Sequence, residues 1–160
     1  MNAAEEIVKY WYQKKGYFLM ESIGLPRGKE IDFLVVKLSK DSKRILDRLH
    51  IEVQVSNRSA NYRDNPNEIA RDYHNKKFKS VERFVREILG SNYKMVEVRG
   101  KMAYRNKDIR DEYIKLRRKK GVEVILFEKI LEEVIGKLRT NTEGNSVIQA
   151  LQLVKFQKGK

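Results

Sequence analysis

The chain of 160 residues contains no cysteine, so disulfide bonds, thiolate metal sites and cysteine nucleophiles are all excluded. We also expect no signal sequence and no membrane span, because no apolar run is long enough to cross a bilayer. Zinc, Walker and dinucleotide-binding signatures do not occur, nor do repeats or low-complexity segments. We therefore expect a cytoplasmic protein without a membrane partner, folded as a single domain across 1–160.

Acidic residues are in the minority. Thirty-five Lys and Arg stand against 22 Asp and Glu, which leaves a formal net charge of +13. Such an excess attracts a polyanion and speeds the encounter with it. Nucleic acid, and DNA in particular, is the expected partner. The alternative is that the basic charge serves solubility alone.

The hydrophobic patterns predict an α/β fold. Helical spacing is found over 3–15, 67–89, 108–120, 129–138 and 146–156. Strand patterns are found over 17–22, 30–38, 49–56, 94–98 and 122–127, with a turn over 24–29. The nearly all-apolar segment 30–38 indicates a central strand. The alternation of strands and helices in the second half predicts parallel pairing late in the sheet.

Acidic residues lie within two of the predicted strands. Asp32 opens the apolar segment 30–38, where an unpaired carboxylate would be costly to keep ionised. Glu52 and Gln54 are two residues apart, so both side chains lie on one face of their strand. If the two strands pair, Asp32 and Glu52 converge, and with the backbone carbonyl of Val53 they offer the oxygen ligands that Mg²⁺ or Mn²⁺ prefers, in a site open to water and phosphate. The alternative is that each acid is a solvated strand-end residue.

This order of residues resembles the PD-(D/E)xK nuclease superfamily. The matching features are an acid in the first helix, Gly-Lys-Glu-Ile-Asp at 28–32, and Glu-Val-Gln at 52–54. Within the superfamily, residues 3–90 are most similar to archaeal Holliday-junction resolvases and related small endonucleases. The resemblance implies a restriction-endonuclease-like α-β-β-β-α-β core over about 3–100, with a mixed central sheet flanked by helices. The basic helix, a strand and a C-terminal helical extension would follow over about 101–160.

The resemblance also implies roles for individual residues. Asp32 and Glu52 would bind one or two divalent metal ions, and Glu5 would hold a metal-bound water. Gln54 would occupy the position at which lysine is usual, and Ser22 would lie near the site. Glu5 is preferred to the neighbouring acid because it borders the apolar face of its helix. The alternative is that first-turn acids only complement the helix dipole.

The glutamine at position 54 departs from the usual pattern, although some restriction endonucleases of the superfamily also carry Gln there. A neutral amide can orient water but cannot supply positive charge. A cation from the helix after the third strand could replace it. The basic residues there are Arg71, His74, Lys76 and Lys77, of which His74 or Lys77 is favoured. The alternative is that these residues are solvated or bind phosphate.

The segment 99–120 contains ten Lys or Arg and only three acids. With Tyr104 and Tyr113 interleaved, it could follow a phosphate backbone and stack on unpaired bases. Residues 57–63 could lie along the substrate strand or close over the site. The alternative is a solvated helix with internal ion pairs, but 117–120 lacks the acids for such pairs. The residues predicted to contact nucleic acid are Lys29, Arg58, Arg63, Arg105, Lys107, Arg117, Arg118, Lys119 and Lys120.

Two functions follow. The first is a Mg²⁺-dependent endonuclease that hydrolyses phosphodiester bonds of DNA, including branched or structured DNA. The second is a catalytically inactive nucleic-acid-binding module, or a subunit of a larger complex, in which Gln54 has abolished cleavage. The three acids favour the enzyme, because carboxylates without metal repel phosphate. A third hypothesis, compatible with both, is an assembly role in which 147–156 forms a homodimer interface.

Overall fold

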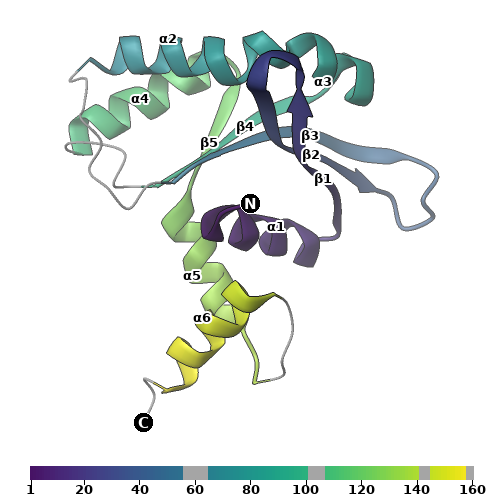
Figure 1. The fold of residues 1–160 in the computed structure, drawn as a ribbon, viewed down its shortest axis with the longest axis vertical. Coiled ribbons are helices and arrows are strands. Elements are labelled where there is room, and N and C mark those ends of the chain that lie inside the picture. The colour runs from purple at the N-terminus through teal and green to yellow at the C-terminus, as the bar shows by residue number, and fades with distance from the viewer. Residues whose placement is uncertain (56–64, 101–106, 141–144, 158–160) are drawn as a thin grey trace.

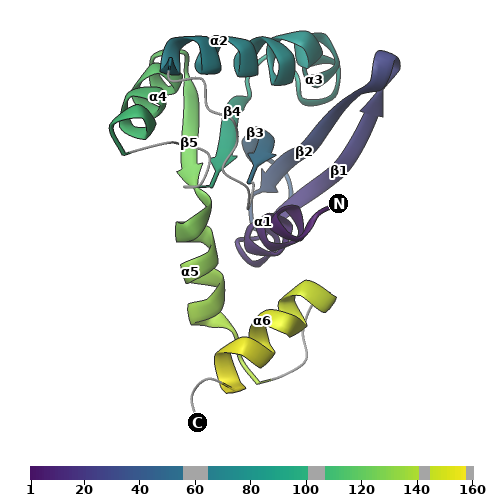
Figure 2. The same ribbon diagram turned by 60° about the vertical axis from the view of Figure 1, so that its left-hand side comes forward.

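The computed structural model describes residues 1–55, 65–100, 107–140 and 145–157, and within them the chain is an α/β protein. A mixed five-stranded open sheet lies between two groups of helices (Figures 1 and 2). The strands are β1 (Tyr17–Leu25), β2 (Lys29–Leu38), β3 (Ile45–Gln54), β4 (Lys94–Arg99) and β5 (Val122–Leu126). The α-helices are α1 (Ala3–Lys14), α2 (Pro66–Lys77), α3 (Glu82–Leu89), α4 (Lys107–Lys119), α5 (Phe127–Lys137) and α6 (Ser146–Gln157).

The strands follow one another across the sheet in sequence order. β1, β2 and β3 form an antiparallel meander, whereas β3, β4 and β5 are parallel, which confirms the parallel pairing predicted for the second half. The prediction that 30–38 forms the central strand was wrong: β2 is second from the edge and β3 is in the middle. Hydrophobicity is misleading here because β3 carries buried polar residues that β2 lacks, among them His50 and Glu52.

The two faces of the sheet differ in chemistry. On one face, alternate residues of β3 and β4 pack with α1 and α5 into the largest apolar cluster, in which Ile51, Val53, Val96 and Val98 are at most 7% exposed. On the other face, under α2 and α4, Glu52 and Glu97 lie side by side in register and both are fully buried. Burial of two acids requires compensating partners. This polar face is where the candidate site is found.

Residues 67–89 do not form the single long helix that their spacing predicts. α2 ends at Lys77, a 3₁₀ turn (Lys79–Val81) follows, and α3 begins at Glu82. The Ser80 hydroxyl donates to the carbonyl of Lys76 at 2.6 Å, and such side-chain bonds compete with the helical ladder. The break turns α3 toward the β1–β2 side of the sheet, where Val81 and Val85 are buried against β2.

Two strand boundaries also differ from expectation. β1 continues to Leu25, so the predicted turn at 24–29 shrinks to a 3₁₀ turn at Pro26–Gly28, in which Arg27 has a φ of 65°. β3 begins at Ile45, four residues before the predicted start, because the β2–β3 hairpin extends beyond the apolar core and leaves Ile45 and Leu46 exposed. Over the described ranges, none of the helices combines the length and apolarity needed to cross a bilayer.

Candidate active site

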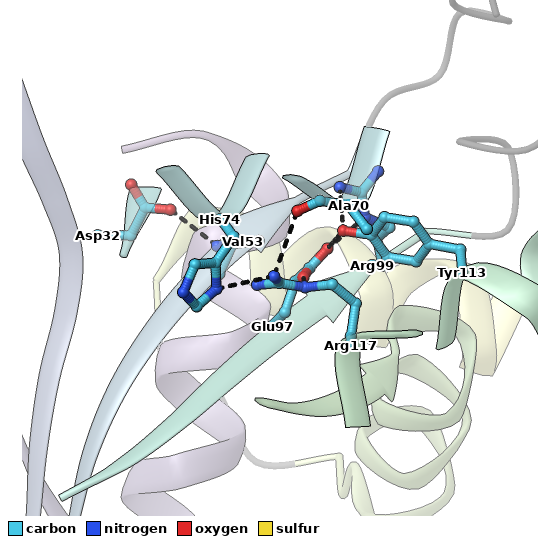
Figure 3. A network of polar contacts seen from close by, with 8 residues as sticks. All are labelled: Asp32, Val53, Ala70, His74, Glu97, Arg99, Tyr113 and Arg117. Carbon is cyan, nitrogen blue, oxygen red and sulfur yellow. Dashed lines mark hydrogen bonds and ion pairs between the residues drawn. The ribbon is translucent and has the colours of Figure 1, made fainter. Parts of the chain in front are cut away.

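The two predicted ligands meet where β2 parts from β3. The β2–β3 ladder runs from the Leu38–Ile45 pair to the Phe33–Ile51 pair, and Asp32 and Glu52 are the next residues in register. Asp32 does not continue the ladder with its backbone; its carboxylate Oδ2 accepts the Val53 amide at 2.8 Å (Figure 3). This bond provides part of the compensation that a carboxylate in an apolar strand requires. The convergence of the two acids agrees with the prediction.

Lys77 of α2 completes the cluster. Its Nζ lies 2.9 Å from Oε2 of Glu52 and 3.6 Å from Oδ1 of Asp32. Of the four basic residues suggested for this role, Lys77 is the one that the structure brings to the acids. The side chains of Glu52, Asp32 and Lys77 are 0%, 10% and 23% exposed. The site is therefore less accessible to solvent than the open site that we predicted.

His50 supports Glu52 from the opposite side. Its Nε2 is 2.8 Å from Oε1 of Glu52, and the ring is fully buried beside Phe78. Burial lowers the pKa of His50 to about 4, although the charge of Asp32 opposes this shift. At neutral pH the ring is therefore uncharged, and Nε2 donates to Glu52 whenever that carboxylate is ionised. The sequence prediction missed His50, although the two-residue period that linked Glu52 to Gln54 also includes it.

The carbonyl of Val53 faces the same way as its amide. The Gln54 carbonyl accepts the Gly100 amide at 3.2 Å, so the backbone of Gln54 points toward β4 and that of Val53 toward β2. In an extended strand, the N–H and C=O of one residue lie on the same side. The carbonyl predicted as a metal ligand is thus on the Asp32 side of β3. The Gln54 side chain is exposed.

Glu5 lies at the edge of this site. It forms a capping box with Asn2, in which its Oε2 accepts the Asn2 amide at 3.0 Å and its Oε1 accepts the Asn2 side chain at 2.6 Å. Partial burial and the charge of Asp32 raise the pKa of Glu5, although its bond to Asn2 opposes the shift. The charge of Asp32 therefore acts on Glu5, while both oxygens of Glu5 accept hydrogen bonds from Asn2 at the helix N-terminus. Ser22 is exposed and has a φ of 49°, on β1 at the level of Asp32.

A second polar network lies on the same face of the sheet (Figure 3). Glu97 accepts Nε of Arg117 at 2.8 Å, the hydroxyl of Tyr113 at 2.6 Å, and Nε of Arg99. Arg117 also reaches the carbonyl of Ala70 at 3.4 Å on α2. The prediction that Arg117 contacts nucleic acid was wrong, because its side chain is fully buried. It joins α4 and α2 to β4.

The remaining basic candidates divide into three groups. Arg71, Lys107, Arg118, Lys119 and Lys120 are exposed, so the structure leaves them available to a polyanion. Lys29 donates to the Ser80 carbonyl at 3.0 Å, and Nδ1 of His74 lies 2.9 Å from Arg117, so neither stands with the acids. Arg58, Arg63 and Arg105 lie outside the described residues.

A metal ion at this site would be bound by side-chain carboxylates, a backbone carbonyl and water molecules. Within the described ranges, no group of three or more His, Asp or Glu side chains is arranged to hold a metal ion. The available oxygens are Oδ1 of Asp32, Oε2 of Glu52 and the carbonyl of Val53. Mg²⁺ retains several waters and commonly uses one or two carboxylates, so this donor set fits it.

The two acids share a tendency to hold a proton near neutral pH. Burial and the charge of Glu52 raise the pKa of Asp32 to about 6. Burial raises the pKa of Glu52 to about 7, although the charge of Lys77 opposes this. A carboxyl whose pKa is raised on folding stabilises the protein fully below its unfolded pKa, and this stabilisation is lost as pH rises through the folded pKa.

We therefore expect Glu52→Gln to gain stability relative to the wild type as pH rises from 4.5 to about 7, the interval between the two pKa values of Glu52. His50 acts in the opposite direction, because its lowered pKa reduces stability as pH falls. It is present in both proteins, so its contribution largely cancels in the comparison. Urea denaturation over this range would measure the difference in free energy of unfolding. A difference that shrinks with rising pH would contradict the assignment.

No protein-family model matches the chain, and no curated protein matches it. Among solved structures, the chain is similar to one titled "Crystal Structure of Protein of Unknown Function AF1548". That similarity covers 88% of this chain and 73% of the other, with 13% sequence identity and a TM-score of 0.46.

Proposed function

We propose that the protein is a divalent-metal-dependent endonuclease that hydrolyses phosphodiester bonds of DNA, with branched or otherwise structured DNA among its substrates. The observation that carries the proposal is the cation already held by the acids: the Lys77 ammonium lies 2.9 Å from Glu52 and 3.6 Å from Asp32. Carboxylates that bind one cation this closely offer a site for another. The order α1, β1, β2, β3, α2 and β4, with α3 as an additional helix before β4, also supports the core implied by the PD-(D/E)xK resemblance.

Each residue would contribute a distinct property. Asp32 is oriented by the Val53 amide and Glu52 by His50, so both carboxylates are preorganised without metal. Mg²⁺ or Mn²⁺, when bound to them, would lower the pKa of bound water and neutralise charge on the phosphate. Lys77 supplies the positive charge that the amide of Gln54 cannot. Its long, flexible side chain can carry that charge from the acids to a phosphate.

The second candidate is a nucleic-acid-binding module without cleavage. Lys77 favours it in one respect, because an ammonium paired with both acids reduces their repulsion of phosphate without any metal. Retention of the acids is then a weaker argument for an enzyme than the sequence suggested. The raised pKa values of Asp32 and Glu52 act in the same direction, since protonated carboxyls repel less.

The two candidates are separated by incubation with linear, single-stranded and four-way-junction DNA in Mg²⁺, Mn²⁺ or EDTA. The endonuclease would nick at least one substrate with metal and none in EDTA. Binding of all substrates without cleavage in either metal would establish the binding module. Cleavage that persists in EDTA would refute the proposed site.

Lys77→Met should separate metal binding from cleavage. Removing the ammonium eliminates the competitor for the two carboxylates, so Mn²⁺ should bind roughly tenfold more tightly in isothermal titration calorimetry. Cleavage should nevertheless fall, since the variant lacks the second positive charge. Lys76→Met is the matched control, because Lys76 is the exposed neighbour on the same helix. Weaker Mn²⁺ binding in Lys77→Met, with Lys76→Met unchanged, would mean that Lys77 only supports the structure.

A further inference from the structure

A polar hollow lies at the C-terminal end of α2, beside the cluster of Asp32, Glu52 and Lys77. It has a volume of about 460 Å³ and is formed by the end of α2, by α3, by the residues leading into β4 and by the end of α4. His74, Asn75 and Lys79 contribute from one side, and Ser91 and Lys120 from the other. Four helical or loop segments thus supply polar groups to one concave surface.

His74 offers this hollow a fixed hydrogen-bond donor. Its Nδ1 lies 2.9 Å from Nη1 of Arg117 (Figure 3), and a guanidinium can only donate, so Nδ1 accepts. In the neutral ring the proton must then be on Nε2, which points away from Arg117. Burial lowers the pKa of His74, and the charges of Arg117 and Lys120 act in the same direction, so the ring is neutral at pH 7. Stacking on Phe78, with centroids 5.8 Å apart, further fixes the ring.

The charge in the hollow is positive. Lys79 and Lys120 both line the hollow and are exposed. The acid in the wall, Glu82, is held by Arg86 at 2.7 Å. The groups that remain for a ligand are the Nε2–H of His74, the two ammonium groups, the Asn75 amide and the Ser91 hydroxyl. All of these can donate hydrogen bonds.

We propose that this hollow binds a phosphate group of a nucleic-acid strand, outside the place where the strand is cut. A phosphate presents several acceptor oxygens on one anion, which matches donors that converge from separate elements. Lys and neutral N–H donors position such a group without reading sequence. The proposal depends on the proposed function only in naming nucleic acid as the source of the phosphate, because free inorganic phosphate has the same chemistry.

The test follows the imidazole of His74 by ¹H–¹⁵N NMR. The chain has two histidines, so the spectrum contains two rings, and His74→Asn identifies the signal. Asn places an acceptor near the position of Nδ1 for Arg117 but removes the Nε2 donor. Wild type, His74→Asn, Lys120→Gln and Lys129→Gln would each be titrated in EDTA with inorganic phosphate and with a single-stranded oligonucleotide. Lys129 is the control, an exposed lysine on α5 at the opposite face of the sheet.

We expect the free protein to show His74 protonated on Nε2, and the oligonucleotide to shift that resonance. Its Kd should rise roughly tenfold in His74→Asn and in Lys120→Gln, and remain unchanged in Lys129→Gln. A shift of the His74 resonance with inorganic phosphate but not with the oligonucleotide would overturn nucleic acid as the ligand. No shift with either probe, or equal effects of Lys120→Gln and Lys129→Gln, would overturn the site. Because EDTA prevents metal-dependent cleavage, a positive result stands even if the protein proves unable to cut.

Discussion

Asp32→Asn and Glu52→Gln should each lower the rate of DNA cleavage by about 10²- to 10³-fold, the range typical for loss of a preorganised electrostatic group. Both substitutions preserve the size and shape of the side chain. The side-chain amide introduced by Asp32→Asn can still accept the Val53 amide, and the one introduced by Glu52→Gln can still accept from His50. The loss would therefore reflect the missing negative charge. Single-turnover cleavage of the best substrate in saturating Mg²⁺ is the measurement.

Two controls make this result specific. Glu132→Gln removes an exposed acid from α5, on the other face of the sheet, and should cleave as the wild type does. Affinity for DNA in EDTA should not fall in Asp32→Asn or Glu52→Gln, because removal of a carboxylate cannot weaken attraction to phosphate. Cleavage within about twofold of wild type in both variants, against the expected loss, would exclude these acids as the catalytic pair.

Glu97→Gln should have the largest effect on stability. Glu97 is the carboxylate between two buried guanidinium groups, those of Arg99 and Arg117, which are 5% and 0% exposed. Without it both cations remain buried with no negative charge in the network. Loss of one partner of a buried ion pair costs about 3–5 kcal/mol, a large part of the stability of an average domain. Equilibrium urea denaturation at pH 7 would measure this loss.

Arg117→Met is the matched comparison for Glu97→Gln. It also removes one charge from the network, but Glu97 keeps Arg99 and the Tyr113 hydroxyl as partners. The network then has one positive and one negative charge where the wild type has two and one. We therefore expect a smaller loss of stability than for Glu97→Gln. A larger loss in Arg117→Met would show that anchoring of α2 at Ala70 outweighs charge balance.

The strand-borne part of the site could be predicted from sequence because the period of a strand is fixed. Two-residue spacing placed Glu52 and Gln54 on one face, and pairing of adjacent strands brought Asp32 to Glu52. Selection of Lys77 over Arg71 and His74 could not be predicted, because it depends on how α2 is rotated against the sheet. That rotation is set by contacts far apart in sequence, such as the one between Arg117 and Ala70.

Arg117 shows the limit of reading charge from sequence. It stands in a run of four basic residues, of which the other three are exposed. Arg117 differs from the other three because it pairs with Glu97, twenty residues earlier on β4. No local sequence pattern predicts that pairing. The break between α2 and α3 was missed for a different reason: the apolar spacing continues through Ser80, while a hydroxyl-to-carbonyl bond ends the helix.

We propose that Asp32 and Glu52 form a divalent cation site, which the Lys77 ammonium occupies when no metal is bound. Calorimetric titration of Mn²⁺ into the wild type and the Asp32→Asn/Glu52→Gln double variant, both without DNA, tests it most directly. We predict saturable Mn²⁺ binding to the wild type and none to the double variant, with both proteins folded by circular dichroism. Equal Mn²⁺ binding by the two proteins, or no Mn²⁺ binding to the wild type, would contradict this assignment.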